Sequence, residues 1–344
     1  MGKKCSTMKT VLFYSSVADK SLFMTQRFYQ IDINILESIG YNVQVSNRIF
    51  DALKFWQYDF VFAYFFRYSL FVAAIAKCFG KKVYLTGGID ALDKKYVGNK
   101  EYRIQRFFFI MCHKIATRCI IVSPSDLKHV EDIVGKNNKK IVLSEHSIDV
   151  ASLLPSENVI RENNFVTIGW MGSVANIQRK GMDRSIHLFH YLRKYPEFKD
   201  SRLLILGQEG EGSAYLKMII EEMHLDASVK IVGKVSETEK REYLQRNKYY
   251  IQLSEYEGFG IAALEALFAG CIVIHSDRGG LSNPIYEAHP LINIDTDLER
   301  QIPSLYDSLL HLKDALIERC SEEYAVYYDN SRRKKEIKTI IEEG

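Results

Sequence analysis

Two glutamates that flank a glycine turn are the residues of this chain best placed to do chemistry. Glu257 and Glu265 stand in the segment SEYEGFGIAALEALFAG, with Gly258 and Gly260 between them. The apolar residues from position 260 onward predict a helix. Backbone N–H groups at a helix start lack intrahelical partners and carry the positive end of the dipole, so a phosphate can dock where glycines keep the approach open.

The two carboxylates are suited to bind hydroxyl groups on either side of that phosphate. Glu257 comes just before the predicted helix, whereas Glu265 lies roughly two turns into it and can reach a second set of hydroxyls. Phosphates flanked by two sets of hydroxyls describe a sugar nucleotide. For any two isolated glutamates, a solvated loop residue and a surface helix residue would be the default interpretation.

The elements around this turn predict an α/β fold. Short apolar runs alternate with helical patterns along the whole chain, which favours parallel, doubly wound sheets. The strands predicted in the first half are 10–14, 41–45, 60–64, 82–85, 119–122 and 140–143. Those predicted in the second half are 165–170, 202–206, 230–232, 249–253 and 271–275.

The length of 344 residues fits two domains of ordinary size. We expect one domain over residues 1–150 and a second over 151–321, joined by a linker over 147–164. Two Rossmann-like domains of this kind would face each other across a cleft at the carboxyl ends of their strands, where open α/β sheets bind ligands.

Charge and cysteine usage restrict the partners and the compartment. Residues 1–150 carry 22 Lys and Arg against 13 Asp and Glu, and the remainder carries 24 against 30. The basic first half therefore predicts an anionic partner. The six cysteines show neither a C-x-x-C pair nor a metal spacing, and no signal-peptide core follows the N-terminus. We expect a cytoplasmic protein without a metal site and without a nucleic-acid partner.

The segment from Glu257 to Gly270, followed by DRGGL at 277–281, resembles the signature of the retaining group-1 (family 4) glycosyltransferases. The resemblance covers residues 165–285 well and the first 150 only in architecture. It implies the GT-B fold, with a last helix, from about 322 to 344, that packs back on the first domain. It also implies metal-independent transfer of a sugar from a UDP- or GDP-linked donor to a glycan or lipid-linked acceptor, in surface polysaccharide or glycolipid assembly. The donor is a substrate, and no cofactor is expected.

The resemblance assigns donor-binding roles to residues of the second half. Glu257 would contact donor-sugar hydroxyls, and Glu265 the ribose. Arg179 and Lys180 would stabilise the leaving diphosphate, although for an isolated Arg-Lys a solvated loop pair is the simpler interpretation. Ser173 stands where the family usually has Arg. The remaining expected contacts are Gly172, Ser173, Gly207, Val232, Gly233, Gly258, Phe259, Gly260 and Ile261.

Asp90 is the candidate from the first half, and with Glu257 and Lys180 it completes the expected catalytic set. The segment LTGGID at 85–90 matches a family loop that reaches the donor sugar from the opposite side. Gly87 occupies a place where many members carry His, so no role of that His can be transferred. A turn or helix-capping Asp is an equally open interpretation of Asp90.

A basic helix is predicted within residues 94–118. Ile104, Phe108, Met111 and Ile115 share one face, and Phe107 and Ile110 interleave with the basic residues on another. Those basic residues are Arg103, Arg106, Lys114 and Arg118. Such a face suits an anionic membrane, so the protein could be peripheral on the inner face of a membrane. A core-packed helix with a solvated basic side is the alternative.

Other functions remain open from the sequence alone. A sugar-nucleotide epimerase or phosphorylase shares the fold, but those families lack the EGFG arrangement. A catalytically silent GT-B scaffold subunit is favoured by Ser173 and Gly87. For a transferase, a front-face substitution in which the leaving phosphate helps to deprotonate the acceptor fits better than a glycosidase-type nucleophile, because no second carboxyl group is positioned across the scissile bond.

Overall fold

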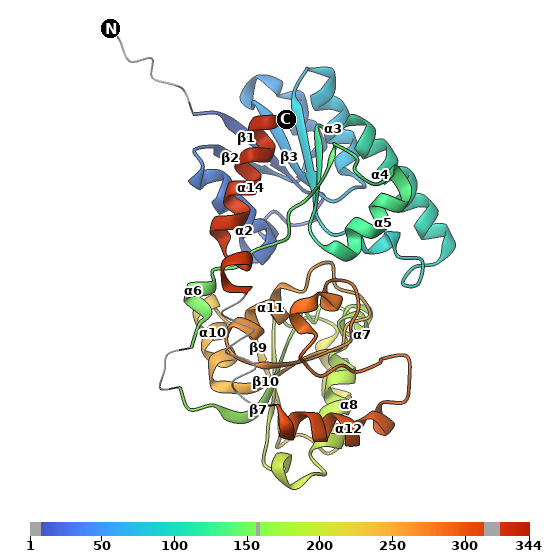
Figure 1. Ribbon diagram of the computed structural model, residues 1–344, viewed down its shortest axis with the longest axis vertical. Helices are drawn as coiled ribbons and strands as arrows, with labels where there is room; N and C mark the ends of the chain where they lie inside the picture. Colours follow the sequence, from blue (N-terminus) through green and yellow to red (C-terminus); the bar gives the residue numbers. More distant parts are fainter. Residues whose placement is uncertain (1–7, 156–158, 313–323) are drawn as a thin grey trace. The chain divides into compact units, whose positions relative to one another are not determined.

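The computed structural model describes residues 8–155, 159–312 and 324–344, and Figure 1 shows its ribbon diagram. The chain divides into two compact units. Unit 1 contains the chain up to Ile148 together with Tyr328–Gly344, and unit 2 contains Asp149–Tyr327. In the residues described, no helix is long and apolar enough to cross a membrane.

Unit 1 is built on a parallel sheet with strand order β2-β1-β3-β4-β5-β6. Every predicted strand of the first half is present, with ends shifted by one residue at most. The strands are β1 (Thr10–Tyr14), β2 (Asn42–Ser46), β3 (Phe60–Tyr64), β4 (Lys82–Thr86), β5 (Arg118–Ile121) and β6 (Ile141–Leu143).

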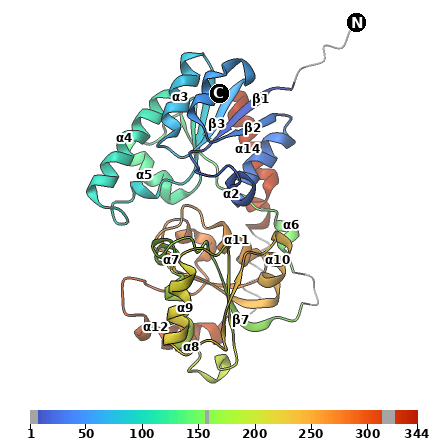
Figure 2. The same cartoon turned by 180° about the vertical axis from the view of Figure 1, so that it is seen from behind.

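Helices cover both faces of this sheet, as right-handed crossovers on a doubly wound sheet require. On one face, α2 (Arg27–Ser38) packs against α14 (Asn330–Glu343), and Figure 2 shows the two side by side. On the other face, the successive connections contact one another in chain order. They are η1 (Ile49–Leu53) with η2 (Phe55–Gln57), α3 (Ser69–Cys78), α4 (Asn99–Ile115) and α5 (Pro124–Val134).

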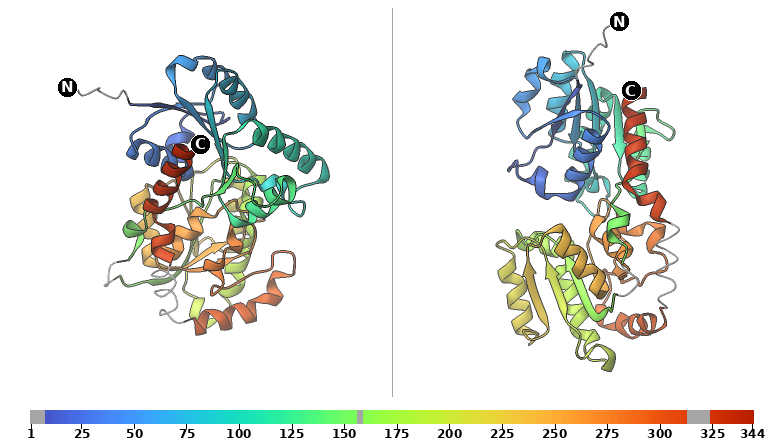
Figure 3. Two further views of the ribbon diagram at one scale, coloured as in Figure 1. Left: turned by 45° about the horizontal axis from the view of Figure 1, so that its top comes forward. Right: turned by 90° about the vertical axis from the view of Figure 1, so that its left-hand side faces the viewer.

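A buried arginine fastens α14 to unit 1, and Figure 3 shows this helix, in red, beside the strands of that unit. The Nε and Nη2 atoms of Arg333 donate to Asp32 at 2.7 and 2.8 Å, and Nη1 donates to the carbonyl of Glu145 at 3.2 Å. The Tyr64 hydroxyl donates to Asp32 at 2.5 Å. Burial alone would raise the pKa of Asp32, but Arg333 outweighs it and the pKa is lowered. The predicted start of this helix at residue 322 lies outside the described residues.

Unit 2 contains a second parallel sheet with strand order β11-β10-β7-β8-β9. The main apolar core lies between this sheet and α8, α9 and α12, whereas α10 and α11 contact each other and belong to the opposite face. The strands are β7 (Glu162–Ile168), β8 (Leu203–Leu206), β9 (Val229–Gly233), β10 (Asn247–Gln252) and β11 (Ile272–His275). The helices are α8 (Met182–Leu192), α9 (Ser213–Glu222), α10 (Glu237–Arg246), α11 (Ile261–Phe268) and α12 (Leu298–His311).

The predicted linker over 147–164 was wrong in extent. Ile148 pairs with Asp329 inside unit 1, and residues 150–153 form the short helix α6 (Val150–Leu153). The Asp149 carboxylate caps α6 by accepting a hydrogen bond from the Ser152 N–H at 3.3 Å. β7 then begins at Glu162, which shortens the connection from both ends.

The apolar face that the sequence indicated for α4 is not the face that the structure buries most deeply. Gln105, Phe109 and Cys112 are buried, whereas Ile104 and Phe108 of the predicted face are only partly buried. Gln105 is accepted in the core because its amide donates to the Phe66 carbonyl at 3.3 Å. Arg118 does not lie on this helix, since it begins β5.

Candidate functional site

The glycine turn before α11 is built from two backbone segments packed directly against each other. Gly260 caps the helix with φ of 86°, a conformation that favours glycine. The Gly280 N–H donates to the Glu257 carbonyl at 2.6 Å. A Cβ at Gly279 would come within 2.2 Å of the same carbonyl, and one at Gly280 within 2.4 Å of Phe259. This close approach of the two backbone segments explains why the DRGGL segment at 277–281 has two consecutive glycines.

Glu257 is a buried carboxylate with several donors around it. Its Oε1 accepts hydrogen bonds from Lys180 Nζ at 2.6 Å, Gln252 Nε2 at 2.5 Å and Ser254 Oγ at 2.8 Å. Burial alone would raise the pKa of Glu257, but Lys180 and these hydrogen bonds outweigh burial and lower it. Glu257 is therefore ionised at neutral pH and firmly held.

A short helix, α7 (Val174–Lys180), brings Lys180 to this carboxylate. Arg179 and Lys180 therefore lie in the last turn of a helix and not in a solvated loop. The Ser173 side chain caps α7 by accepting from the Asn176 N–H at 3.2 Å, so in this structure Ser173 acts as a helix cap. Gly181 ends the helix in the left-handed region, where a Cβ would meet the Leu253 carbonyl at 1.9 Å. This contact fixes the end of α7 against the strand that leads to Glu257.

The Lys180–Glu257 pair lies where a doubly wound sheet binds ligands. The chain proceeds from β7 outward through β8 and β9, then returns to β10 on the other side of β7. Lys180 follows β7, and Glu257 follows β10, so both come from the switch point of the sheet. Arg179 is nearby, since it contributes to lowering the pKa of Glu257, and its guanidinium donates to Asn176 at 3.2 Å.

Glu265 forms the second buried pair, with a lysine that the sequence analysis missed. Lys240 Nζ, on α10, donates to Glu265 Oε2 at 2.7 Å and lies 2.8 Å from Glu237. The Lys240 side chain is 12% exposed and that of Glu265 is 3% exposed. A capping box between Ser236 and Glu239 fixes the start of α10 and thereby the position of Lys240 one turn later.

Tyr250 connects the surroundings of the two glutamates. Its hydroxyl donates to Gln252 Oε1 at 2.8 Å, and the Gln252 amide donates in turn to Glu257. Burial first, and then the charges of Glu257 and Glu265, raise the pKa of Tyr250 well above its ordinary value. Both carboxylates therefore act on one buried phenol.

The remaining predicted residues of the second half gather at the same edge of the sheet of unit 2. The Gly207 N–H donates to the Gly233 carbonyl at 2.9 Å, and a Cβ on Gly207 would meet the Gly169 carbonyl at 1.9 Å. Gly172 lies against the Trp170 ring. Val232 belongs to β9, and Gly258, Phe259, Gly260 and Ile261 form the turn and first residue of α11.

Asp90 belongs to unit 1, whereas all the other predicted site residues belong to unit 2. It begins the short helix η3 (Asp90–Leu92), and its Oδ1 accepts from the Ala91 N–H at 3.0 Å. The N-cap position of η3 is Ile89 and no side chain of the described residues caps this helix, so the helix-capping interpretation of Asp90 is wrong. Its catalytic role stays a prediction.

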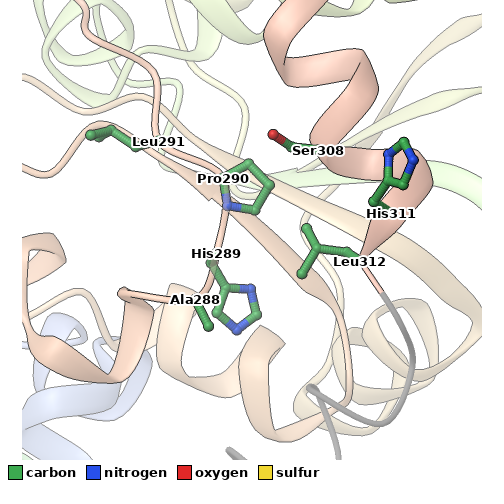
Figure 4. Close-up of a pocket in the computed structure, with 7 residues that line it drawn as sticks. All are labelled: Ala288, His289, Pro290, Leu291, Ser308, His311 and Leu312. Atoms are coloured by element: carbon green, nitrogen blue, oxygen red, sulfur yellow. The ribbon is translucent and has the colours of Figure 1, made fainter.

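A shallow pocket of about 380 Å³ lies elsewhere in unit 2 and is shown in Figure 4. None of the residues predicted for the site lines it. The lining residues are Ala288, His289, Pro290, Leu291, Ser308, His311 and Leu312. In the described part of the chain, no group of three or more His, Cys, Asp or Glu side chains is arranged to hold a metal ion.

Relatives of known activity match parts of the chain. GDP-mannose:cellobiosyl-diphosphopolyprenol alpha-mannosyltransferase from Xanthomonas oryzae pv. oryzae is 35% identical over 100 residues, which is 28% of this chain and 26% of that protein. N-acetylgalactosamine-N,N'-diacetylbacillosaminyl-diphospho-undecaprenol 4-alpha-N-acetylgalactosaminyltransferase from Campylobacter jejuni is 22% identical, over 66% of this chain and 61% of that protein. The matched segments thus span less than two thirds of either relative.

Solved structures establish the fold over nearly the whole chain. Sucrose-phosphate synthase from Thermosynechococcus elongatus superposes with a TM-score of 0.73 at 14% identity, covering 97% of this chain and 98% of that one. WaaG, a glycosyltransferase involved in lipopolysaccharide biosynthesis, gives 0.73 at 16% identity, covering 97% and 100%. The two parallel sheets thus have the GT-B fold that the sequence predicted. The family model for group 1 glycosyl transferases matches residues 162–342, which is more than half of the chain and includes every site residue described in unit 2. The chain therefore belongs to the group 1 glycosyltransferases.

Proposed function

We propose that the protein is a retaining, metal-independent glycosyltransferase that moves a sugar from a UDP- or GDP-linked donor to a glycan or lipid-linked acceptor. The observation that carries the proposal is the buried Lys180–Glu257 pair at the switch point of unit 2, beside the glycine turn of α11. A buried ion pair is a weak source of stability, so its place at a ligand-binding edge favours a functional role.

Each part of the donor has a chemically matched partner in this site. The N–H groups at the start of α11 suit the diphosphate, because they lack intrahelical acceptors and the helix dipole is positive there. Lys180 and Arg179 supply cations for the charge that develops on the leaving nucleoside diphosphate. Glu265, held by Lys240, is suited to the ribose hydroxyls, and Glu257 to the donor sugar.

The way in which Glu257 is held supports a front-face substitution over a double displacement through an enzyme carboxylate. A carboxylate nucleophile needs a lone pair directed at the anomeric carbon, but Glu257 already accepts hydrogen bonds from Lys180, Gln252 and Ser254. In a front-face substitution, the bond from the anomeric carbon to the phosphate oxygen breaks while the acceptor oxygen bonds to that carbon on the same face. The acceptor proton passes to the departing phosphate, so no enzyme carboxylate has to become covalently attached.

The lipid-linked acceptor is supported by the relatives, whose names specify diphosphopolyprenol and diphospho-undecaprenol carriers. We expect assembly of a surface polysaccharide or glycolipid at the cytoplasmic side of a membrane. The full protein would be incubated with UDP- and GDP-sugars and polyprenyl diphosphate-linked acceptors, and nucleotide release would be measured.

The product's anomeric configuration, determined by NMR, tests the mechanism separately from the activity. Transfer with retention supports the proposal, and inversion would overturn the front-face mechanism. Binding of a nucleoside diphosphate without transfer to any acceptor in the panel would favour a silent scaffold. Epimerised donor or sugar 1-phosphate as the product would identify an enzyme of the same fold but another class.

A further inference from the structure

One layer of unit 1 exposes most of the large aromatic side chains that reach the surface. Six Phe and Trp side chains are largely exposed in the described residues, and five of them lie on the η1–η2, α3 and α4 layer. These five, called the aromatic surface below, are Phe50, Trp56, Phe71, Phe79 and Phe107. Phe50 is 77% exposed and Trp56 is 70% exposed, although each could have been buried at a large gain in a folded core.

The topology places these side chains on adjoining elements. α3 contacts both η1 and α4. The connections run from the carboxyl end of one strand to the amino end of the next, so η1–η2 and α3 run in the same direction along the sheet. Phe50 and Phe71 therefore lie toward one end of the layer, and Trp56 and Phe79 toward the other. The stacking of Phe55 on Phe79, with centroids 4.1 Å apart, fixes this alignment.

The exposed charges of α4 beside the aromatic surface are basic, and the acid Asp51 of η1 is paired with Lys54 at 2.9 Å. On α4, Arg103, Arg106 and Lys114 are exposed, and at helical spacing they share a face with Phe107. The nearby acid Glu101 is engaged by Arg67 at 2.7 Å. Aromatic side chains next to Arg and Lys are the composition that binds the interface of an anionic bilayer.

A second copy of the chain would be a poor occupant of the same surface. Face-to-face pairing would bring Arg103, Arg106 and Lys114 of the two copies close together, and like charges oppose such contacts. An anionic lipid surface neutralises the same residues and accepts the aromatic rings. The basic residues therefore favour an anionic lipid surface over a second copy of the chain as the binding partner.

We infer that the η1–η2, α3 and α4 layer of unit 1 docks on an anionic membrane, with Trp56 and Phe50 inserted among the headgroups and Arg103, Arg106 and Lys114 bound to lipid phosphates. The inference rests on the proposed function in one respect: a lipid-linked acceptor would then be met at the surface where the enzyme is held. The docking surface thus joins the basic face of α4 to the exposed aromatic side chains of η1, η2 and α3.

Trp56 itself can report on the docking, because the chain has only one other tryptophan, Trp170. A Trp170→Phe protein is titrated with vesicles of phosphatidylglycerol and phosphatidylcholine, and with phosphatidylcholine alone. We expect a blue-shifted emission with the anionic vesicles and quenching by brominated acyl chains. No shift with anionic vesicles would overturn the inference, as would a shift that grows with protein concentration in the absence of lipid.

Charge variants test the electrostatic part on folded protein. We expect Arg103→Glu/Arg106→Glu to weaken vesicle binding at least about tenfold. The matched control Lys199→Glu/Arg300→Glu reverses two exposed charges of unit 2 and should bind like the parent protein. Equal binding by the two double variants would refute a role of α4. Calorimetric titration of the same proteins with UDP and GDP separates this result from the proposed function, since lost vesicle binding with intact nucleotide binding concerns the docking surface alone.

Discussion

The buried ion pair Arg333–Asp32 of unit 1 and the pair Lys180–Glu257 of unit 2 differ in what surrounds them. In unit 1, Arg333 is fully buried and its guanidinium is wholly engaged by Asp32 and the carbonyls and hydroxyl of residues 144 and 145. In unit 2, the Lys180 side chain is 23% exposed and pairs with Glu257 at the switch point of the sheet. The first pair joins α14 to the body of its unit, whereas the second leaves a cation accessible where a ligand would bind.

The difference shows that the location of a buried ion pair, rather than its presence, indicates its role. Desolvation of two charges is costly, and an apolar replacement is often as stable. A pair with every donor used by the protein can specify how two elements join. A pair at a strand end with one partly exposed member can also receive a charged substrate.

The largest effect is expected at the partly exposed pair. Replacing Lys180 by Met removes the cation that faces the leaving diphosphate, and kcat/KM should fall about 10³-fold. Steady-state kinetics with the identified donor would measure it. Lys194→Met, at an exposed ion pair of the same unit, is the matched control.

Loss of stability and loss of catalysis can be separated at this pair. Lys180→Met alone leaves the buried Glu257 carboxylate without its cation, so it should also destabilise unit 2. The double variant Lys180→Met/Glu257→Gln removes both charges and should recover stability without recovering activity. If the double variant recovered activity, the pair would have a structural role only and no role in catalysis.

The fully enclosed pair should affect stability alone. Arg333→Met leaves Asp32 buried without its partner and should lower the free energy of unfolding of unit 1 by about 3 kcal/mol, measured by urea denaturation. Arg333→Met/Asp32→Asn should regain part of this loss. Below the unfolding transition, nucleotide binding by unit 2 should be unchanged. Weakened nucleotide binding by a folded Arg333→Met protein would contradict the contrast between the two pairs.

Acid should weaken unit 1 through the histidine beside its ion pair. Burial, together with the charge of Arg333, lowers the pKa of His146 to about 3. The unfolded chain binds a proton near pH 6.5 and the folded chain does not, so stability falls as the pH drops from about 6.5 toward 3.

A histidine-to-glutamine pair of variants checks this pH dependence. Between pH 7 and pH 5, His146→Gln should lose about 2 kcal/mol less unfolding free energy than the parent protein. The same change at the exposed His311 is the control. An identical loss in the parent and His146→Gln proteins would exclude His146 as the cause.

The sequence predicted well what is repeated locally and poorly what depends on contacts between distant segments. Alternating apolar runs were sufficient for both sheets, and the glycines around Glu257 were sufficient for the turn, because each signal is carried by neighbouring residues. Arg333 stands in the charged run SRRKKE, which is typical of a solvated helix, and its partner Asp32 is some 300 positions away. Three consecutive Phe residues in α4 made several core faces possible, and the polar Gln105 concealed the correct one.

Lys240 is a site residue that could not be recognised from the sequence either, because its role depends on a contact with a distant residue. The effect of replacing it is the smallest that we predict. Lys240 lies in the charged run ETEKRE, where nothing local distinguishes it from its neighbours, yet it holds Glu265 at 2.7 Å. If Glu265 binds the ribose, loss of this contact should misplace the carboxylate and raise the donor KM about tenfold while kcat changes little.

A nucleotide that lacks one ribose hydroxyl distinguishes positioning from a general loss of structure. The parent protein should bind the nucleoside diphosphate more tightly than its 2′-deoxy analogue, because a hydrogen bond to a charged carboxylate is lost. In Lys240→Met this preference should shrink, since the misplaced Glu265 no longer reads the hydroxyl. Glu237→Gln, which alters the exposed partner of Lys240, should keep the preference. An undiminished preference in Lys240→Met would mean that Lys240 supports only the packing of α10 on α11, as Arg333 supports α14 in unit 1.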